Sequence, residues 1–147
     1  MKAMDQASIT FPSRSANEGF ARACAACFAA QLDPTLDEVA DIKTAVSEAV
    51  TNAIVHAYPD CLGKITLRLR LFEGGVVEIQ VKDSGVGIPD VDQARTPLFT
   101  TGGEERSGMG FTIMESFMDG LKVRSQPGKG TVVTMRKRIA RRAGVSK

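Results

Sequence analysis

Two short motifs about thirty residues apart constrain this chain more than any other feature. The first runs from Glu48 to His56, and its polar residues Glu48, Asn52 and His56 recur every four positions. Because residues four apart lie on the same side of an α-helix, a helix here would give them one polar face. The second motif, Asp83-Ser-Gly85-Val-Gly87, follows an alternating strand pattern and leaves an acid at a glycine turn.

A third piece, Ser107-Gly108-Met109-Gly110-Phe111, predicts the start of another helix. Backbone N–H groups at a helix start lack partners within the helix and favour anions such as phosphate. A carboxylate, an amide, an acid at a turn and these glycines together predict a nucleotide site. The chain has no Gly-x-x-x-x-Gly-Lys-Ser/Thr segment and lacks the protein-kinase motif set, which argues against both of those phosphate-binding types.

The composition indicates a single domain spanning residues 1–147, large enough to bury a core. Hydrophobic residues make up 43% of the chain and charged residues 24%, as in ordinary globular proteins. No apolar run reaches the roughly 20 residues of a membrane helix, and the first residues contain no secretion-signal core. We therefore expect a cytoplasmic protein without membrane contact.

The net charge of +2 is unevenly distributed. A basic tail, about residues 136–147, holds six Lys or Arg side chains and no acid, which leaves −4 on residues 1–135. A mildly acidic body does not fit a nucleic-acid reader, so no direct nucleic-acid contact is expected. We expect the tail to be a solvated strand end and frayed terminus, with a docking patch as the less favoured alternative.

The three cysteines predict free thiols, because nothing in the chain indicates export to an oxidising compartment. Cys24-Ala-Ala-Cys27 has the spacing of redox and zinc motifs, but it lies inside an alanine-rich helical stretch and no second such pair exists. We expect these side chains to be small, buried packing residues.

Two capping patterns place the first two helices. Ser15 with Glu18 predicts a helix that runs to about Leu32, and Thr35 with Glu38 predicts a second helix that stops near Tyr58-Pro59. The expected apolar side of the second helix comprises Leu36, Val39, Val46, Ala49, Val50, Ala53 and Ile54. A third amphipathic helix is expected over residues 111–118.

Strand patterns occupy much of the remaining chain. Residues 8–12 predict a short edge strand, since Pro12 cannot donate to a ladder. Alternation over residues 65–71 and 77–81, joined by Gly74-Gly75, predicts a hairpin that delivers Asp83 to the edge of the sheet. A last hairpin is expected from residues 121–125 and 131–139. The predicted class is α+β: a two-layer α/β sandwich with helices on one face of a mixed, mostly antiparallel sheet.

Residues 84–107 are rich in glycine and proline and show little periodicity. A segment of this length without regular structure is uncommon in a compact domain and predicts a functional lid over about residues 84–107.

Each candidate functional residue on the predicted helix also has an ordinary structural explanation. Glu48 is either a solvated surface acid or, with Asn52 one turn later, a general base or water-positioning group. Asn52 either bonds backbone or offers a neutral oxygen to Mg²⁺. His56 is the only histidine and is expected to cap or pack the helix end rather than contact phosphate.

Asp83 is either a plain turn acid or an acceptor for the exocyclic amine of a purine, which would select adenine over guanine. Gly85 and Gly87 would then let the backbone approach the base. Asp-x-Gly-x-Gly alone is a weak pattern, but it gains specificity from the helix motif before it and the glycine-rich helix start after it.

In this order the three motifs resemble the ATP-binding boxes of the Bergerat superfamily of gyrases, heat-shock chaperones, histidine kinases and mismatch-repair ATPases. Over nearly the whole chain, longer segments resemble the family of sporulation anti-sigma-F factors, serine kinases of spore-forming bacteria. These segments are Phe20-Ala-Arg22, Leu32-Asp-Pro, Ser47-Glu-Ala-Val-Thr-Asn-Ala-Ile, Gly85-Val-Gly-Ile-Pro-Asp, Pro97-Leu-Phe-Thr-Thr and Glu105-Arg-Ser-Gly-Met-Gly-Phe-Thr-Ile-Met-Glu.

The resemblance implies a protein that binds a sporulation sigma factor and keeps it from RNA polymerase. It also implies use of Mg²⁺ and ATP, with ADP as product, to phosphorylate a serine on an anti-anti-sigma partner. A homodimer is implied as well, and we expect its interface near residues 8–12 or the first helix.

The resemblance also implies roles for individual residues. Glu48 would be the catalytic base, Arg106 the lid arginine that meets the terminal phosphate, and Asn52 the Mg²⁺ ligand. Asp83 would read adenine, and Arg22 would lie at the partner surface. The remaining nucleotide-binding residues implied are Gly85, Gly87, Thr101, Ser107, Gly108, Met109, Gly110 and Thr131, the last on the adenine side.

Three alternatives remain open at this point. A detached ATP-binding domain of a histidine kinase fits poorly, since the chain lacks a dimerisation helix pair that carries a phospho-acceptor. A non-catalytic, ATP-gated module that sequesters a sigma factor would not need Glu48. A general-stress anti-sigma kinase of similar architecture differs only in its choice of partner.

Overall fold

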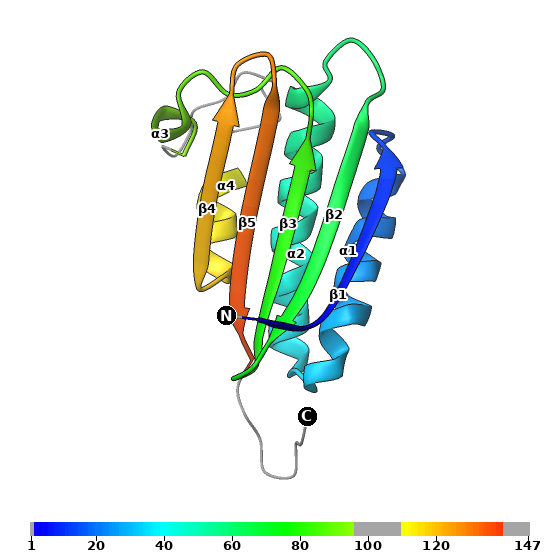
Figure 1. Ribbon diagram of the computed structural model, residues 1–147, viewed down its shortest axis with the longest axis vertical. Helices are drawn as coiled ribbons and strands as arrows, with labels where there is room; N and C mark the ends of the chain where they lie inside the picture. The colour runs from blue at the N-terminus through cyan, green and yellow to red at the C-terminus, as the bar shows by residue number, and fades with distance from the viewer. Residues whose placement is uncertain (1, 96–109, 140–147) are drawn as a thin grey trace.

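The computed structural model describes residues 2–95 and 110–139, which form two layers (Figure 1). The strands, in their order across the sheet, are β1 (Ala3–Pro12), β2 (Lys64–Phe72), β3 (Val76–Asp83), β5 (Gly130–Arg138) and β4 (Gly120–Gln126). The α-helices are α1 (Asn17–Ala29), α2 (Leu36–Asn52), α3 (Val91–Ala94) and α4 (Gly110–Phe117). A 3₁₀-helix, η1 (Ala30–Leu32), extends α1, and a π-helix, η2 (Ala53–Ala57), extends α2.

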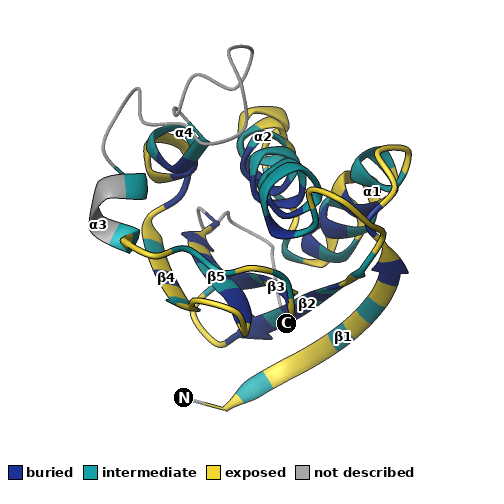
Figure 2. Ribbon diagram, turned by 90° about the horizontal axis from the view of Figure 1, so that it is seen from above, coloured by how far each residue is buried: buried dark blue, intermediate teal, exposed yellow. Residues whose placement is uncertain are grey.

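Helices α1, α2 and α4 cover one face of the sheet (Figure 2). Helix α1 packs on β2, α2 on β3 and α4 on β4, with the apolar core between the layers. The predicted α+β two-layer sandwich is therefore confirmed. Among the helices in the described part of the chain, none is long and apolar enough to cross a membrane.

All four strand pairings are antiparallel, so the sheet is not mixed as expected. Strands β2 and β3 form a hairpin, and so do β4 and β5. Between β1 and β2 the chain passes through two helices, α1 and α2, so β2 starts at the end of the sheet where β1 finishes and pairs with it antiparallel. Strand β1 is an edge strand, as predicted, but it begins at Ala3 rather than near residue 8. Most of its side chains are exposed, so its first half lacks the alternation by which a strand is recognised.

The predicted capping box of Ser15 and Glu18 is absent, and Ala16 is the N-cap of α1. The Glu18 carboxylate accepts a hydrogen bond from the Ser47 hydroxyl at 2.7 Å and lies 3.5 Å from the Arg22 guanidinium. A contact with α2 therefore occupies the carboxylate that a local capping box would need.

Helix α2 does begin with its predicted capping box. The Glu38 N–H donates to Thr35 Oγ1 at 3.0 Å, and the Thr35 N–H donates to the Glu38 carboxylate at 2.8 Å. Leu36, by contrast, is 88% exposed and does not belong to the apolar side. It precedes the buried Ile42 by six residues, which places it about 120° around a helix of 3.6 residues per turn.

Alanines bring α1 close to its neighbours. Ala21, Ala25 and Ala29, spaced four apart, are fully buried. The three cysteines are free thiols, as predicted, but Cys24 is only half-buried and Cys27 is exposed, so the predicted burial of this pair is wrong. Burial, and secondarily the neighbouring Cys27, raises the pKa of the Cys24 thiol.

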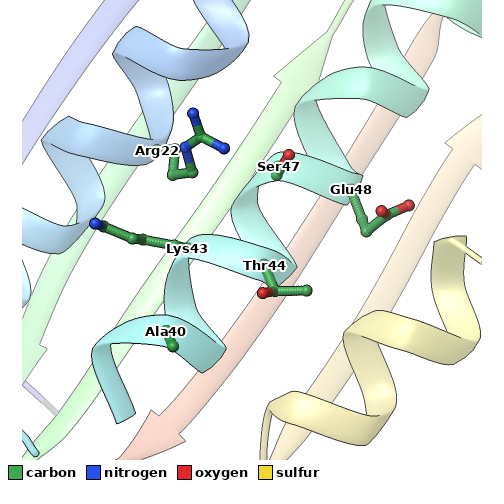
Figure 3. A pocket seen from close by; sticks show the side chains of 6 residues that line it. All are labelled: Arg22, Ala40, Lys43, Thr44, Ser47 and Glu48. Atoms are coloured by element: carbon green, nitrogen blue, oxygen red, sulfur yellow. The ribbon is translucent and has the colours of Figure 1, made fainter. Parts of the chain in front are cut away.

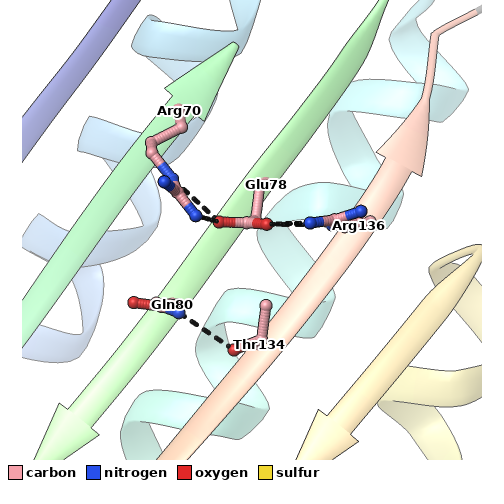
Figure 4. Close-up of polar contacts among 5 residues, drawn as sticks. All are labelled: Arg70, Glu78, Gln80, Thr134 and Arg136. Atoms are coloured by element: carbon pink, nitrogen blue, oxygen red, sulfur yellow. Dashed lines mark hydrogen bonds and ion pairs between the residues drawn. The ribbon is translucent and has the colours of Figure 1, made fainter. Parts of the chain in front are cut away.

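The sheet face opposite the helices carries a buried carboxylate, Glu78, that is 1% exposed (Figure 4). It accepts hydrogen bonds from Arg70 on β2 and from Arg136 Nε on β5, the latter at 2.9 Å. Both guanidinium groups also lie over the Phe72 ring, at 5.2 and 5.5 Å from its centre. Burial alone would raise the pKa of Glu78, but the two arginines outweigh it and hold the pKa below its ordinary value.

These contacts give the start of the basic tail ion-pair partners. Arg136 pairs with Glu78, and Lys137 Nζ lies 3.2 Å from the Asp41 carboxylate of α2. Residues 136–138 end strand β5, with Arg136 and Arg138 exposed and Lys137 buried. The rest of the tail, residues 140–147, lies outside the described residues.

We expect Glu78→Gln to lower the free energy of unfolding by about 1–2 kcal/mol at pH 7, because two cations lose their shared anion. A carboxyl group whose pKa is depressed by folding stabilises the fold above its unfolded pKa and loses that contribution as the pH falls through the folded value. The difference between wild type and variant should therefore shrink below about pH 4.5. Urea unfolding at pH 7 and pH 4 measures it.

Glu73→Gln is the matched control, since Glu73 is exposed in the turn between β2 and β3. It should unfold like the wild type at both pH values. Equal unfolding curves for wild type and Glu78→Gln at pH 7 would contradict the stabilising role of the Glu78 cluster.

Candidate functional site

The first two predicted motifs reach the same end of the molecule, at the top of Figure 1. The end of β3, the end of α2 with its π-helix, and the turn between β4 and β5 all lie there. Strand β3 is the middle strand of the sheet, so Asp83 lies at a strand end flanked by β2 and β5.

Asp83 is 7% exposed, which does not fit a plain turn acid. Within the described residues, its Oδ1 accepts hydrogen bonds from the N–H groups of Gly85 at 3.0 Å and Thr131 at 3.2 Å. Burial raises the pKa of Asp83 above its ordinary value, and these two N–H groups offset only part of that effect. The carboxylate is thus held in a fixed direction in a poorly solvated place, where a ligand donor would gain from its charge.

Asn52 and Gly110 meet where α2 ends and α4 begins. A Cβ atom at Gly110 would lie 2.8 Å from Asn52 Nδ2 and 3.1 Å from Asn52 Oδ1, so any larger residue there would displace the Asn52 amide. The structure therefore brings the helix motif and the third, glycine-rich motif together, as a shared nucleotide site requires.

Gly85 and Gly87 are needed for a reason that the sequence did not predict. A Cβ at Gly85 would lie 2.1 Å from the Ala57 carbonyl oxygen, and one at Gly87 would lie 2.3 Å from that of Gln126. Gly87 also has a positive φ of 79°, which other residues rarely adopt. The close approach that these glycines permit is to the protein's own backbone.

The π-helix η2 was not predicted either. It lies between Asn52 and Tyr58 and contains His56, which is half-buried. π-Helical turns occur frequently at functional sites. The Ala57 carbonyl at its end accepts the Val86 N–H at 3.0 Å, so the π-helix holds the loop that follows Asp83.

Thr131 is 7% exposed, and its hydroxyl lies 2.8 Å from the Ser125 hydroxyl. Ser125 was not among the predicted residues, yet its Oγ accepts the Ile88 N–H at 2.7 Å. A serine within a strand gives no sequence signal for such a role. The two residues connect the end of β4 and the start of β5 to the loop after Asp83.

Glu48 lies on α2 one turn before Asn52 and is half-buried. In Figure 3 its side chain points towards α4, whereas Lys43 and Ser47 lie on the α1 side. An open hollow across α1 and α2 is lined by Arg22, Ala40, Lys43, Thr44, Ser47 and Glu48. The Arg22 side chain lies at its rim and is 44% exposed.

Five predicted residues lie outside the described residues: Thr101, Arg106, Ser107, Gly108 and Met109. The first part of the predicted lid is described and is not wholly irregular, because it contains helix α3. Arg95, just after α3, pairs with Glu115 of α4 at 2.8 Å. Among residues 2–95 and 110–139, no cluster of three or more acidic, histidine or cysteine side chains could hold a metal ion.

Comparison with known proteins agrees with the fold described above. A family profile described as "Histidine kinase-like ATPase domain" matches residues 11–137. The solved RsbU and RsbW domains of a Mycobacterium tuberculosis protein superpose with a TM-score of 0.68 at 22% identity, over 98% of this chain and 35% of that longer chain. The blue-light activated histidine kinase of Erythrobacter litoralis EL346 gives a TM-score of 0.58 at 27% identity, over 73% of this chain and 32% of that chain.

Curated relatives are much more similar in sequence. "Anti-sigma F factor" of Caldanaerobacter subterraneus subsp. tengcongensis is 58% identical over 90% of this chain and 93% of its own length. "Anti-sigma F factor" of Geobacillus stearothermophilus is 57% identical over 88% of this chain and 89% of its own. Identity at this level over nearly the full length of both chains shows that this protein belongs to the anti-sigma F factor family and carries a histidine kinase-like ATPase domain.

Proposed function

We propose that this protein binds a sporulation sigma factor and keeps it from RNA polymerase. We also propose that it uses Mg²⁺-ATP to phosphorylate a serine on an anti-anti-sigma protein. The observation that carries the nucleotide part is the buried Asp83 carboxylate, held by two backbone N–H groups at the end of β3. The sigma factor as a partner rests on the name of the relatives, "Anti-sigma F factor". The anti-anti-sigma substrate rests on the family resemblance described above.

The site fits a purine nucleotide. Asp83 Oδ1 already accepts two hydrogen bonds, and the exocyclic amine at C6 of adenine would donate to the same carboxylate, whereas guanine carries a carbonyl oxygen at that position. Thr131, joined to Asp83 through its N–H, would lie on the adenine side. The Asn52 amide beside the start of α4 would lie near the phosphates, where helix N-terminal N–H groups favour anions.

Bound Mg²⁺-ATP would supply the transferable phosphoryl group and offset its charge. Asn52 would offer a neutral oxygen to the metal. Glu48, four residues earlier on the same helix, would accept or orient the proton of the substrate serine. Arg106, with Gly108 and the rest of the lid, is proposed to meet the terminal phosphate.

The partner surface is proposed to include Arg22 and the hollow beside it. This hollow reaches Glu48, so a docked substrate loop could present its serine to the proposed base. A homodimer, a cytoplasmic location and the single domain over residues 1–147 remain predictions. The general-stress kinase, which differs in its partner, and the non-catalytic binding module remain the alternatives. The following experiment separates the kinase from the binding module.

The proposed kinase is tested with Glu48→Gln. Transfer of labelled γ-phosphate from Mg²⁺-ATP to the cognate anti-anti-sigma protein should fall by at least about 100-fold, the usual contribution of a general base. The affinity for ATP should stay within about twofold of wild type, because the carboxylate proposed to bind adenine is Asp83 and not Glu48. Labelled phosphoserine and equilibrium ATP binding are the two measurements.

Glu73→Gln makes the same chemical change on an exposed turn and should transfer phosphate like the wild type. If wild type captures the sigma factor in the presence of ATP but labels no serine, the binding-module alternative replaces the kinase.

Adenine recognition is tested with Asp83→Asn. Loss of a charged hydrogen bond of about 1.5–3 kcal/mol should lower ADP affinity by roughly tenfold or more. The amine needs the ionised carboxylate, and burial raises the pKa of Asp83 in the free protein. The affinity of wild type for ADP should therefore fall as the pH drops through that raised pKa. Asp83→Asn should not show this pH-dependent loss of affinity.

Calorimetric titration with ADP between pH 7.5 and 5 measures both effects. Protonation of the ADP phosphates affects binding to both proteins equally, so Asp83→Asn also serves as the control for that effect. A variant with wild-type ADP affinity at pH 7.5 would show that Asp83 is not the adenine reader.

A further inference from the structure

Tyr58 connects two distant backbone segments through a single hydroxyl group. The hydroxyl donates to the Lys64 carbonyl oxygen at 2.7 Å and accepts the Ser84 N–H at 2.7 Å. Since its one proton goes to Lys64, the oxygen presents a lone pair to Ser84. Tyr58 therefore holds the residue that directly follows Asp83.

The Ser84 N–H belongs to the same planar peptide unit as the Asp83 carbonyl group. That carbonyl oxygen lies against Gly130, where an added Cβ would be only 2.1 Å away. The peptide unit is thus held from both sides, by Tyr58 at its N–H and by the start of β5 at its oxygen. Holding both ends sets the ψ angle of Asp83 and with it the direction of the carboxylate.

The rest of this loop is fixed by other contacts. Val86 donates to Ala57 at 3.0 Å and accepts the Gly128 N–H at 2.7 Å. Among the residues that the structure describes, the Tyr58 hydroxyl is the side-chain group that bonds the Asp83–Ser84 peptide unit.

The Tyr58 ring is itself held in place by Gly63. A Cβ at Gly63 would lie 2.1–2.4 Å from three atoms of the ring, so the ring rests directly on the glycine backbone. Gly63 is fixed in turn by Ser13: the Ser13 N–H donates to the Gly63 carbonyl at 2.8 Å, and the Gly63 N–H donates to Ser13 Oγ at 2.9 Å. The position of the hydroxyl is therefore set by the packing of the β1–α1 connection against the segment between η2 and β2.

We infer that Tyr58 is a positioning residue for base recognition: its hydroxyl orients the Asp83–Ser84 peptide unit so that the Asp83 carboxylate meets the exocyclic amine of adenine. This inference rests on the proposed nucleotide site. A residue that acts through Asp83 should affect the recognition of the amine and should leave phosphate and ribose contacts unchanged.

The test compares ADP with inosine 5′-diphosphate, which carries a carbonyl oxygen in place of the amine. Tyr58→Phe keeps the ring and removes the hydroxyl. We expect the variant to bind ADP about five- to tenfold more weakly and to bind inosine diphosphate within about twofold of wild type. Calorimetric titration well below the melting temperature measures the two affinities, and their ratio is the readout.

Ile42→Val is the control for a general loss of stability, since Ile42 is fully buried in the middle of α2 away from this loop. It should keep the wild-type ratio even where its melting temperature matches that of Tyr58→Phe. An unchanged ratio in Tyr58→Phe, or an equal loss for both nucleotides, overturns the inference. A wild type that does not prefer ADP to inosine diphosphate overturns adenine reading itself, which is a separate failure.

A second measurement does not depend on the variant's folding. Tyr58 is the one tyrosine in the chain, so 3-fluorotyrosine labelling gives a single ¹⁹F resonance. Saturating ADP should shift this resonance more than saturating inosine diphosphate does, because the ADP amine engages the carboxylate that Tyr58 positions. Equal shifts, or none, would overturn the inference.

Discussion

The site depends on one constraint, the burial of the Asp83 carboxylate at the end of the middle strand. A buried carboxylate is costly unless hydrogen bonds compensate it. Gly85 and Thr131 supply two N–H groups, and both must be held in place for the compensation to persist. The turn glycines, the π-helix and the start of β5 all contribute to that, so the fold around the site can be understood as support for a single side chain.

The sequence predicted the architecture well where patterns are local and periodic. Thr35 and Glu38 form the expected capping box, and Gly74-Gly75 make the expected turn with positive φ angles. Predictions failed where a tertiary contact changed a local preference. Glu18 could not be assigned correctly because its partner, Ser47, lies on another helix. The first half of β1 was missed because pairing with β2, not burial of its own side chains, makes it a strand.

For the site, the sequence predicted residue types better than their contacts. It placed Asp83, Asn52 and Gly110 in one site, and the structure brings the last two into direct apposition. It did not predict the π-helix, nor that Gly85 and Gly87 approach backbone carbonyl groups of Ala57 and Gln126. Tyr58 and Ser125 were missed for a related reason. They act through backbone groups distant in sequence, and neither belongs to a motif that indicates chemistry by itself.

Helix α2 gives the two halves of the proposed function a common support. Its outward face lines the hollow beside Arg22, and its end carries Asn52 next to α4. Glu48 lies between these two places on the same helix. A partner in the hollow and a nucleotide at the helix end would therefore act on one element. Linkage then requires reciprocity: if a bound nucleotide changes the affinity for a partner, that partner changes the affinity for the nucleotide by the same factor.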